Sequence, residues 1–345
     1  MIAALIRFSL TQRLMLLLIA AALTITGVWA YRTLPIDAFP DITSPQVQVI
    51  AKAPGMAPSE VETRITFPLE MEMQGLPRQT VLRTTTKYAL AVIVIDFEDG
   101  TDIYWARNQV AERLNQVRAG LPANSEVGLA PITTPLSELY MYRIEGGGLS
   151  NAELRAVQDW TIRPRLRTVS GVADVNSLGG EVRAFEVAPD TSRLAAQGIG
   201  IDELAKALET SNRNAGGDRI NRGDEILLVR TVGALQTLDD VRNVTVATRH
   251  GTPVRVADVA DVRLGALTRY GGVTYSARTD TEAAPRFGES VTGLVLLRKG
   301  ENGRSTVEGV KRELEALKAA LPQGVTITPF YDRTELIEAA VWTVE

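Results

Sequence analysis

The pattern of apolar and polar residues opens with one long uncharged run. Residues 14–31 carry no charge, and an α-helix needs about 20 apolar residues to cross the hydrocarbon core of a bilayer. Trp29 and Tyr31 stand where interfacial aromatic residues are common, and Arg7 and Arg13 favour a cytoplasmic amino terminus. The run predicts a retained membrane anchor. A cleaved signal peptide, whose apolar core usually has about 7 to 15 residues, is the alternative.

Further along, the apolar positions repeat at an offset of 200 residues. Segments 92–131 and 292–331 each predict a strand, a turn, an amphipathic helix, a proline stop and another strand. Identical or similar residues coincide without gaps at these pairs: Gly100 and Gly300, Val110 and Val310, Leu114 and Leu314, Val117 and Leu317, Ala119 and Ala319, Leu121 and Leu321, Pro122 and Pro322. The matches indicate duplication of one structural unit.

Each copy follows another strand, helix and strand. The predicted elements are 47–53, 59–75 and 81–86 before the first copy, and 138–144, 151–171 and 172–178 before the second. Pro68 corresponds to Pro164 and Gly75 to Gly171, both at an offset of 96. Each complete unit is therefore predicted to be a βαβ–βαβ, ferredoxin-like fold, so the fold class is α+β.

The second unit is interrupted by residues 182–272, which have the pattern of a separate α+β domain. A strand at 182–187 precedes a helix at 191–212 that is broken near Gly198 and Gly200. Residues 216–231 combine turn residues with strand formers and predict a hairpin arm suited to clasp a partner.

Composition excludes several kinds of site. The chain has 37 basic and 41 acidic residues without a block of like charge, which gives nucleic-acid binding no support. It has no cysteine, which excludes thiolate metal sites and cysteine nucleophiles. Its single histidine, His250, precedes a glycine in a predicted turn, which argues against His-rich zinc sites and Ser-His-Asp triads.

The acidic segment at 96–102 does not have the spacing of a calcium-binding loop. Gly100 closing a strand, with Thr101 or Asp102 capping the next helix, explains it better. No nucleotide-binding motif is present, and we expect neither catalytic residues nor a cofactor.

Six motifs resemble the heavy-metal-efflux branch of the resistance-nodulation-division transporters. They are LPIDAFPDI (34–42), FEDGTDIYWAR (97–107), VQDW (157–160), GVADVNSLGG (171–180), TPVRVADVADVRLG (252–265) and YDRTELI (331–337). The resemblance extends from Met1 to Glu345 and implies a membrane transporter rather than an enzyme.

The resemblance implies a division of the chain into seven parts. These are a cytoplasmic amino terminus with transmembrane helix 1 (1–32), a linker (33–43), porter subdomain 1 (44–134), the first half of porter subdomain 2 (135–181), a docking domain (182–272), the second half of porter subdomain 2 (273–331) and the start of transmembrane helix 2 (332–345). Because residues 335–345 resemble the beginning of a span, we expect an amino-terminal fragment of a longer, multi-pass protein.

The implied function is proton-driven efflux of heavy-metal cations. By resemblance, the chain belongs in the bacterial inner membrane with most of its residues in the periplasm. Its implied partners are two further copies in a homotrimer, a membrane-fusion adaptor, an outer-membrane channel and the lipid bilayer, without nucleic acid. The proton-carrying acidic residues of such pumps lie in a later span, and residues 14–31 contain none.

Two acidic residues are the candidate metal ligands, Glu138 and Asp174. The resemblance adds that divalent-cation members often have a glutamate at the place of Glu138. We expect strands 138–144 and 172–178 to be neighbours, which would bring the carboxylates together as a hard-cation site. Met71 and Met73 point to different faces of one helix and do not form a thioether cluster. Zinc, cobalt, cadmium or nickel is therefore favoured over copper or silver.

Two alternatives remain open. A multidrug pump of the same superfamily would share the fold but carry organic compounds, and aromatic residues, which line such pockets, are only 6% of this chain. A membrane-anchored periplasmic assembly module without transport is the other alternative.

Overall fold

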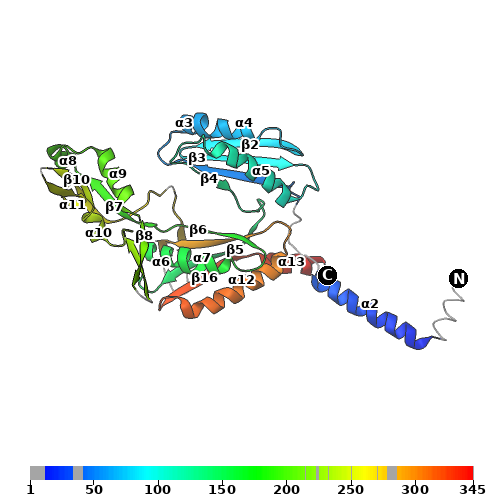
Figure 1. The fold of residues 1–345 in the computed structure, drawn as a ribbon. Coiled ribbons are helices and arrows are strands. Elements are labelled where there is room, and N and C mark those ends of the chain that lie inside the picture. Colours follow the sequence, from blue (N-terminus) through cyan, green and yellow to red (C-terminus); the bar gives the residue numbers. More distant parts are fainter. Residues whose placement is uncertain are drawn as a thin grey trace. The chain divides into compact units, whose positions relative to one another are not determined.

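The computed structural model describes residues 12–33, 42–213, 215–222, 225–231, 233–249, 251–269, 271–277 and 286–344 (Figure 1). These residues belong to two compact units. Unit 1 comprises Met1–Gly147, Gln158–Leu178 and Thr292–Glu345, and unit 2 comprises Gly148–Val157 and Gly179–Val291. The predicted insertion at 182–272 lies within unit 2, which extends beyond it on both sides. His250, the tip of the predicted hairpin arm and most of the motif at 34–42 lie outside the described residues.

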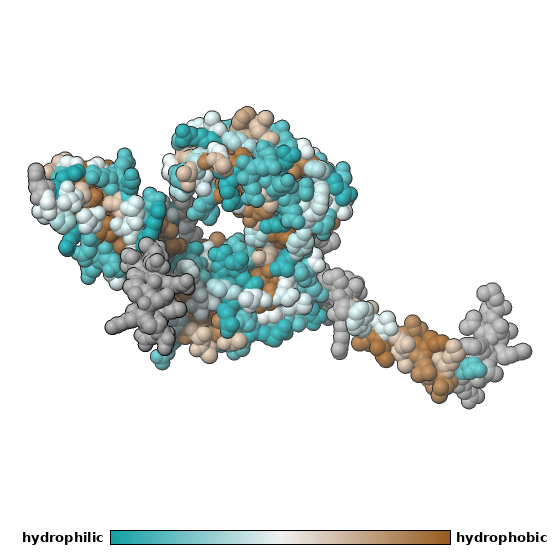
Figure 2. Space-filling model, viewed as in Figure 1, coloured by the Kyte–Doolittle hydropathy of each residue, from teal (hydrophilic) through white to brown (hydrophobic). Residues whose placement is uncertain are grey.

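The predicted anchor begins as a regular helix, α2 (Arg13–Thr33). Its apolar side chains are exposed along the helix, and Figure 2 shows brown apolar patches on it, interspersed with paler residues. Leu14 is 76% exposed, Ile25 70% and Trp29 66%, so no helix or strand among the described residues covers these side chains. Among the helices of the described residues, none is long and apolar enough to cross a membrane.

The first sheet of unit 1 has the strand order β2-β3-β1-β4, and its paired strands are antiparallel. Its strands are β1 (Gln46–Lys52), β2 (Gln79–Lys87), β3 (Leu90–Phe97) and β4 (Glu126–Leu129). The helical segments α3 (Pro58–Val61), η1 (Glu62–Thr66) and α4 (Phe67–Met73) connect β1 to β2, and α5 (Ile103–Arg118) connects β3 to β4. This strand order, with a helical crossover after β1 and after β3, is that of a ferredoxin-like βαβ–βαβ unit.

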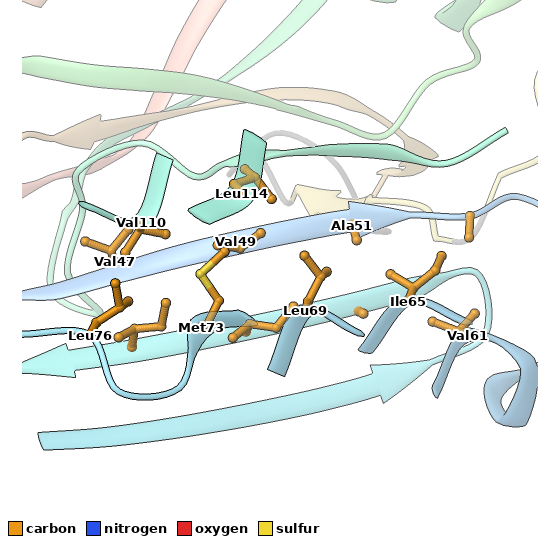
Figure 3. Packing of buried hydrophobic residues seen from close by; sticks show 14 of the residues in the cluster. Val47, Val49, Ala51, Val61, Ile65, Leu69, Met73, Leu76, Val110 and Leu114 are labelled. Carbon is orange, nitrogen blue, oxygen red and sulfur yellow. The ribbon is translucent and has the colours of Figure 1, made fainter. Parts of the chain in front are cut away.

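Alternation along β1 and β3 builds the core of this sheet. Val47, Val49 and Ala51 are buried while the residues between them are partly exposed, as expected for a strand with one buried face. Figure 3 shows these side chains meeting Leu69 and Met73 from α4. Full burial of such an aliphatic side chain contributes about 1.5–3 kcal/mol, so the layer of helices on the sheet is held mainly by apolar contact.

The second sheet of unit 1 has the order β16-β5-β15-β6. Its strands are β5 (Glu138–Gly146), β6 (Val172–Leu178), β15 (Val291–Leu297) and β16 (Val325–Asp332). The connecting helical segments in unit 1 are η2 (Gln158–Ile162), α7 (Arg163–Leu166), α12 (Gly303–Leu317) and η3 (Lys318–Ala320), and α13 (Arg333–Val344) follows β16. When the strands of each sheet are numbered in chain order, both sheets have the order 2-3-1-4, so the two sheets share one topology.

The offset of 200 residues is visible in matching helix starts. Asp102 and Asn302 are the N-caps of α5 and α12, and each accepts a hydrogen bond from the backbone N–H three residues later, at 2.7 Å and 3.1 Å. Gly100 and Gly300 have φ of 79° and 86°, a conformation that favours glycine. The interpretation of 96–102 as a turn and helix cap is confirmed, with Asp102 as the cap.

The offset of 96 residues has a counterpart that the sequence pattern did not reveal. A π-helical turn, η1 or η2, interrupts the first helix of each ferredoxin-like unit at equivalent positions. Pro68 and Pro164 stand two residues after these turns. Because proline lacks the N–H that an α-helix requires in its interior, a wider turn accommodates the local break in the ladder.

Unit 2 contains short helices and two-stranded sheets, with pairs β10-β11, β7-β12, β13-β14 and β8-β9. Its helices are α6 (Asn151–Val157), α8 (Thr191–Gln197), α9 (Ile201–Ser211), α10 (Leu238–Arg242) and α11 (Val256–Val259). Its strands are β7 (Arg183–Pro189), β8 (Ala215–Arg222), β9 (Glu225–Thr231), β10 (Thr245–Arg249), β11 (Thr252–Arg255), β12 (Ala260–Ala266), β13 (Thr274–Ala277) and β14 (Arg286–Glu289). The predicted helix break is present, since Gly198 ends α8 with φ of 61°.

Candidate functional site

Glu138 is the first residue of β5 and its side chain is exposed. The next residue, Leu139, is fully buried and the previous one, Ser137, is 3% exposed. Within the described part of the chain, no hydrogen bond or ion pair engages the Glu138 carboxylate. The strand holds the backbone of Glu138 in place, and its carboxylate oxygens are available to a cation.

Asp174 lies on β6 in a different environment. Its side chain is 14% exposed and forms ion pairs with Arg163 Nη2 and Arg167 Nε, each at 3.3 Å. The backbone N–H of Val175 also donates to Asp174 Oδ1 at 2.7 Å. Two guanidinium groups already compensate this carboxylate, so a cation would have to compete with them. The geometry describes a structural ion-pair cluster between β6 and α7.

The expectation that strands 138–144 and 172–178 are neighbours is wrong. Strand β15 lies between β5 and β6, and Leu296 of β15 is the residue opposite Asp174. Two strand spacings of about 4.8 Å therefore separate Glu138 from Asp174 laterally. The physical reason is the split βαβ connection, whose two parallel strands leave room for a third strand between them.

In the part of the chain that the structure describes, no third carboxylate or imidazole completes a site with Glu138 and Asp174. Among the described residues, no group of three or more His, Cys, Asp or Glu side chains is placed to hold a metal ion. The methionines agree with the sequence expectation, since Met73 is fully buried in the first core whereas Met71 is 57% exposed. They do not share a face and do not form a thioether pair.

Sequence reasoning missed a buried polar pair in the second sheet. The hydroxyl of Tyr142 on β5 donates to Gln158 Oε1 at 2.9 Å, and both residues are fully buried. Burial raises the pKa of the Tyr142 hydroxyl well above its ordinary value, which keeps it a neutral donor. Gly293 leaves room for the ring. An isolated glycine inside an apolar strand is the signal that marked this close approach.

Comparison with known proteins gives a family match along almost the whole chain. A family model described as the AcrB/AcrD/AcrF family matches residues 5–345. Protein HelA of Legionella pneumophila is 40% identical over 352 residues, which cover 100% of this chain and 32% of HelA. The cobalt-zinc-cadmium resistance protein CzcA of Cupriavidus metallidurans is 37% identical over 349 residues, 99% of this chain and 32% of CzcA.

Other matches agree. The cation efflux system protein CusA of Escherichia coli is 39% identical over 344 residues, 99% of this chain and 32% of CusA. Two crystal forms of a heavy metal efflux pump superpose with TM-scores of 0.85 and 0.84, at 33% and 34% identity, over 99% and 97% of this chain and 33% of each pump chain. The chain thus spans 32–33% of the length of these relatives.

Proposed function

Because the chain belongs to the AcrB/AcrD/AcrF family, we propose that it forms part of a proton-driven pump that exports heavy-metal cations. The observation that carries this proposal is a similarity of 33–40% identity over 97–100% of the chain to proteins named for metal resistance, cation efflux or heavy metal efflux. The family resemblance expected from the sequence motifs is confirmed.

The two ferredoxin-like sheets are the proposed porter subdomains, at 44–134 and at 135–181 with 273–331. The insertion at 182–272 is the proposed docking domain. We further propose assembly as a homotrimer with a membrane-fusion adaptor and an outer-membrane channel in the bacterial inner membrane, with these domains in the periplasm. The exposed apolar side chains of α2 support its insertion into lipid as transmembrane helix 1, and α13 is proposed to lead into a second span.

Glu138 is the proposed metal ligand of this chain. Its carboxylate is exposed at the start of β5 and is not neutralised by a basic side chain within the described residues, which favours binding of a divalent ion such as zinc, cobalt, cadmium or nickel. Asp174 was the second candidate, and its two arginine partners favour a structural role instead. The ligands that complete the coordination sphere are proposed to lie in the remainder of the pump.

The chemistry of this proposal is binding and release, without a covalent step. A cation that binds more tightly in one conformation than in another shifts the population of the two states. Glu138 supplies the negative charge for binding, and proton entry elsewhere in the full protein supplies the bias that completes the cycle.

A growth-inhibition panel tests the function. Cells that lack their own metal pumps receive the complete gene with its adaptor and channel, and are challenged with zinc, cobalt, nickel, cadmium, copper and silver. Protection against divalent ions that is lost in Glu138→Gln and kept in Asp174→Asn would support the proposal. Protection against organic compounds alone would favour the multidrug alternative, and protection against none would favour an assembly module.

A further inference from the structure

The segment that joins the two sheets of unit 1, residues 130–137, is held at several carbonyl groups. We call it the connecting segment. Arg107 Nη1 of α5 donates to Ala130 O at 2.6 Å near its start. The Lys299 backbone N–H donates to Ile132 O at 3.3 Å, and the Leu297 N–H donates to Ser137 O at 2.7 Å. The connecting segment therefore has a fixed path that ends at Glu138.

Arg333 holds the same segment from the first turn of α13. The residue is only 3% exposed, and its Nη1 atom donates to the carbonyl of Leu136. A guanidinium donor makes this hydrogen bond stronger than one between neutral groups. The contact joins two places 197 residues apart in the sequence, and Leu136 is two residues before Glu138.

The start of α13 is itself tied to unit 1. Asp332 ends β16 and forms an ion pair with Lys311 of α12. The backbone N–H of Thr334 donates to Asp332 Oδ1 at 2.9 Å, while Ile337 is 1% exposed. The first turn of α13 thus packs as a rigid continuation of the second sheet, and a movement of that turn would pull on Leu136.

We propose that Arg333 is a positioning residue that couples the movement of α13 to the placement of Glu138 through the carbonyl of Leu136. This inference rests on the proposed function, in which Glu138 binds the cation and α13 leads into the membrane. Lys299, whose backbone N–H binds the connecting segment, also donates from its Nζ atom to Thr43 O at 2.5 Å. Thr43 follows α2 in the sequence. Thr43, which follows the first proposed span, and Arg333, which precedes the second, are therefore both linked by hydrogen bonds to the connecting segment or to Lys299.

The test uses the full-length pump with Arg333→Met, which keeps the side chain's length and apolar stem but removes the donor. The thermal midpoint of Arg333→Met shows whether the variant folds. Arg304→Met is the matched control, since Arg304 is an exposed arginine whose ion-pair partner among the described residues is Glu308 on its own helix. Arg333→Lys restores a charged donor.

Hydrogen exchange of the backbone amides measures how firmly the connecting segment is held. We expect faster exchange of the amides at 130–137 in Arg333→Met, and exchange like that of the unmodified pump in Arg304→Met. In proteoliposomes with a proton gradient, the maximal Zn²⁺ transport rate of Arg333→Met should fall about tenfold, within the range typical of coupling between sites. Arg333→Lys should recover part of the rate and of the protection at 130–137.

Unchanged exchange at 130–137, or faster exchange without a loss of rate, would overturn the inference. A loss of thermal stability that accounts for the lower rate and is not reversed by Arg333→Lys would assign Arg333 a purely structural role. If the unmodified pump moves no metal ion, the proposed function fails and coupling to transport fails with it, while hydrogen exchange still decides whether Arg333 holds the segment.

Discussion

Gly293 on β15 lies directly beside the ring of Tyr142 on β5, so closely that a Cβ atom at position 293 would overlap the ring. The same ring donates its hydroxyl proton to Gln158 at 2.9 Å. A small residue on one strand thus makes room for a buried hydrogen bond between its neighbouring strand and the π-helical turn.

Gly293→Ala is expected to lower the free energy of unfolding by about 1–3 kcal/mol, the usual cost of overpacking a core. The added methyl group must displace Tyr142, which also strains its hydrogen bond to Gln158. Denaturant titration of the purified protein measures the change. Gly128→Ala is the control, because Gly128 also lies in a strand but a Cβ atom there meets nothing within 4 Å. Equal effects of the two substitutions would contradict the argument.

Asp174→Asn is expected to lower stability, whereas Glu138→Gln is expected to impair metal transport without a loss of stability. Removing the Asp174 charge leaves Arg163 and Arg167 without their shared partner, and because both arginines are partly exposed the cost should be about 1 kcal/mol. Glu138→Gln should leave stability unchanged, since its carboxylate has no partner in the described residues. Thermal unfolding at low and high salt measures both effects. The Asp174 effect should shrink at roughly 1 M salt, because the Debye length is then only about 3 Å.

Periodicity was sufficient to predict the elements of unit 1 and their duplication. The apolar positions of α12 repeat every three or four residues, and Val307, Val310 and Leu314 are indeed buried. Caps and glycine turns are local, so Asp102 and Gly100 were readable from a few residues. The π-helical turns were not, because they depend on how a proline is accommodated within a packed helix.

Strand neighbours were harder to predict than strands. Periodicity gives the face of each strand but not its position in the sheet. Strand β15 lies between β5 and β6, although it begins 113 residues after the end of β6 in the sequence. The partners of Asp174 were invisible for a related reason. Arg163 and Arg167 are close to Asp174 only because α7 packs beside β6, a tertiary relationship that no local motif records.

The Asp332 carboxyl makes the stability of unit 1 depend on pH. Burial by itself raises its pKa, but hydrogen bonds from Lys311 and Thr334 outweigh burial and hold the pKa below its ordinary value. A carboxyl with a lowered folded-state pKa contributes stability above its unfolded pKa of about 3.9 and loses it as the pH falls through the folded value. The thermal midpoint of Asp332→Asn should be lower than that of the unmodified protein at neutral pH, and the gap should close on acidification.

The matched helix caps allow a test in which each copy of the repeat is the control for the other. Asp102→Ala and Asn302→Ala should each lower the free energy of unfolding by about 1 kcal/mol, because each leaves a backbone N–H at a helix start without its acceptor. Asp102→Asn should be nearly neutral, since asparagine already performs this role at position 302. Denaturant titration compares the variants. A loss in Asp102→Asn as large as that in Asp102→Ala would mean that the charge, rather than the hydrogen bond, stabilises the start of α5.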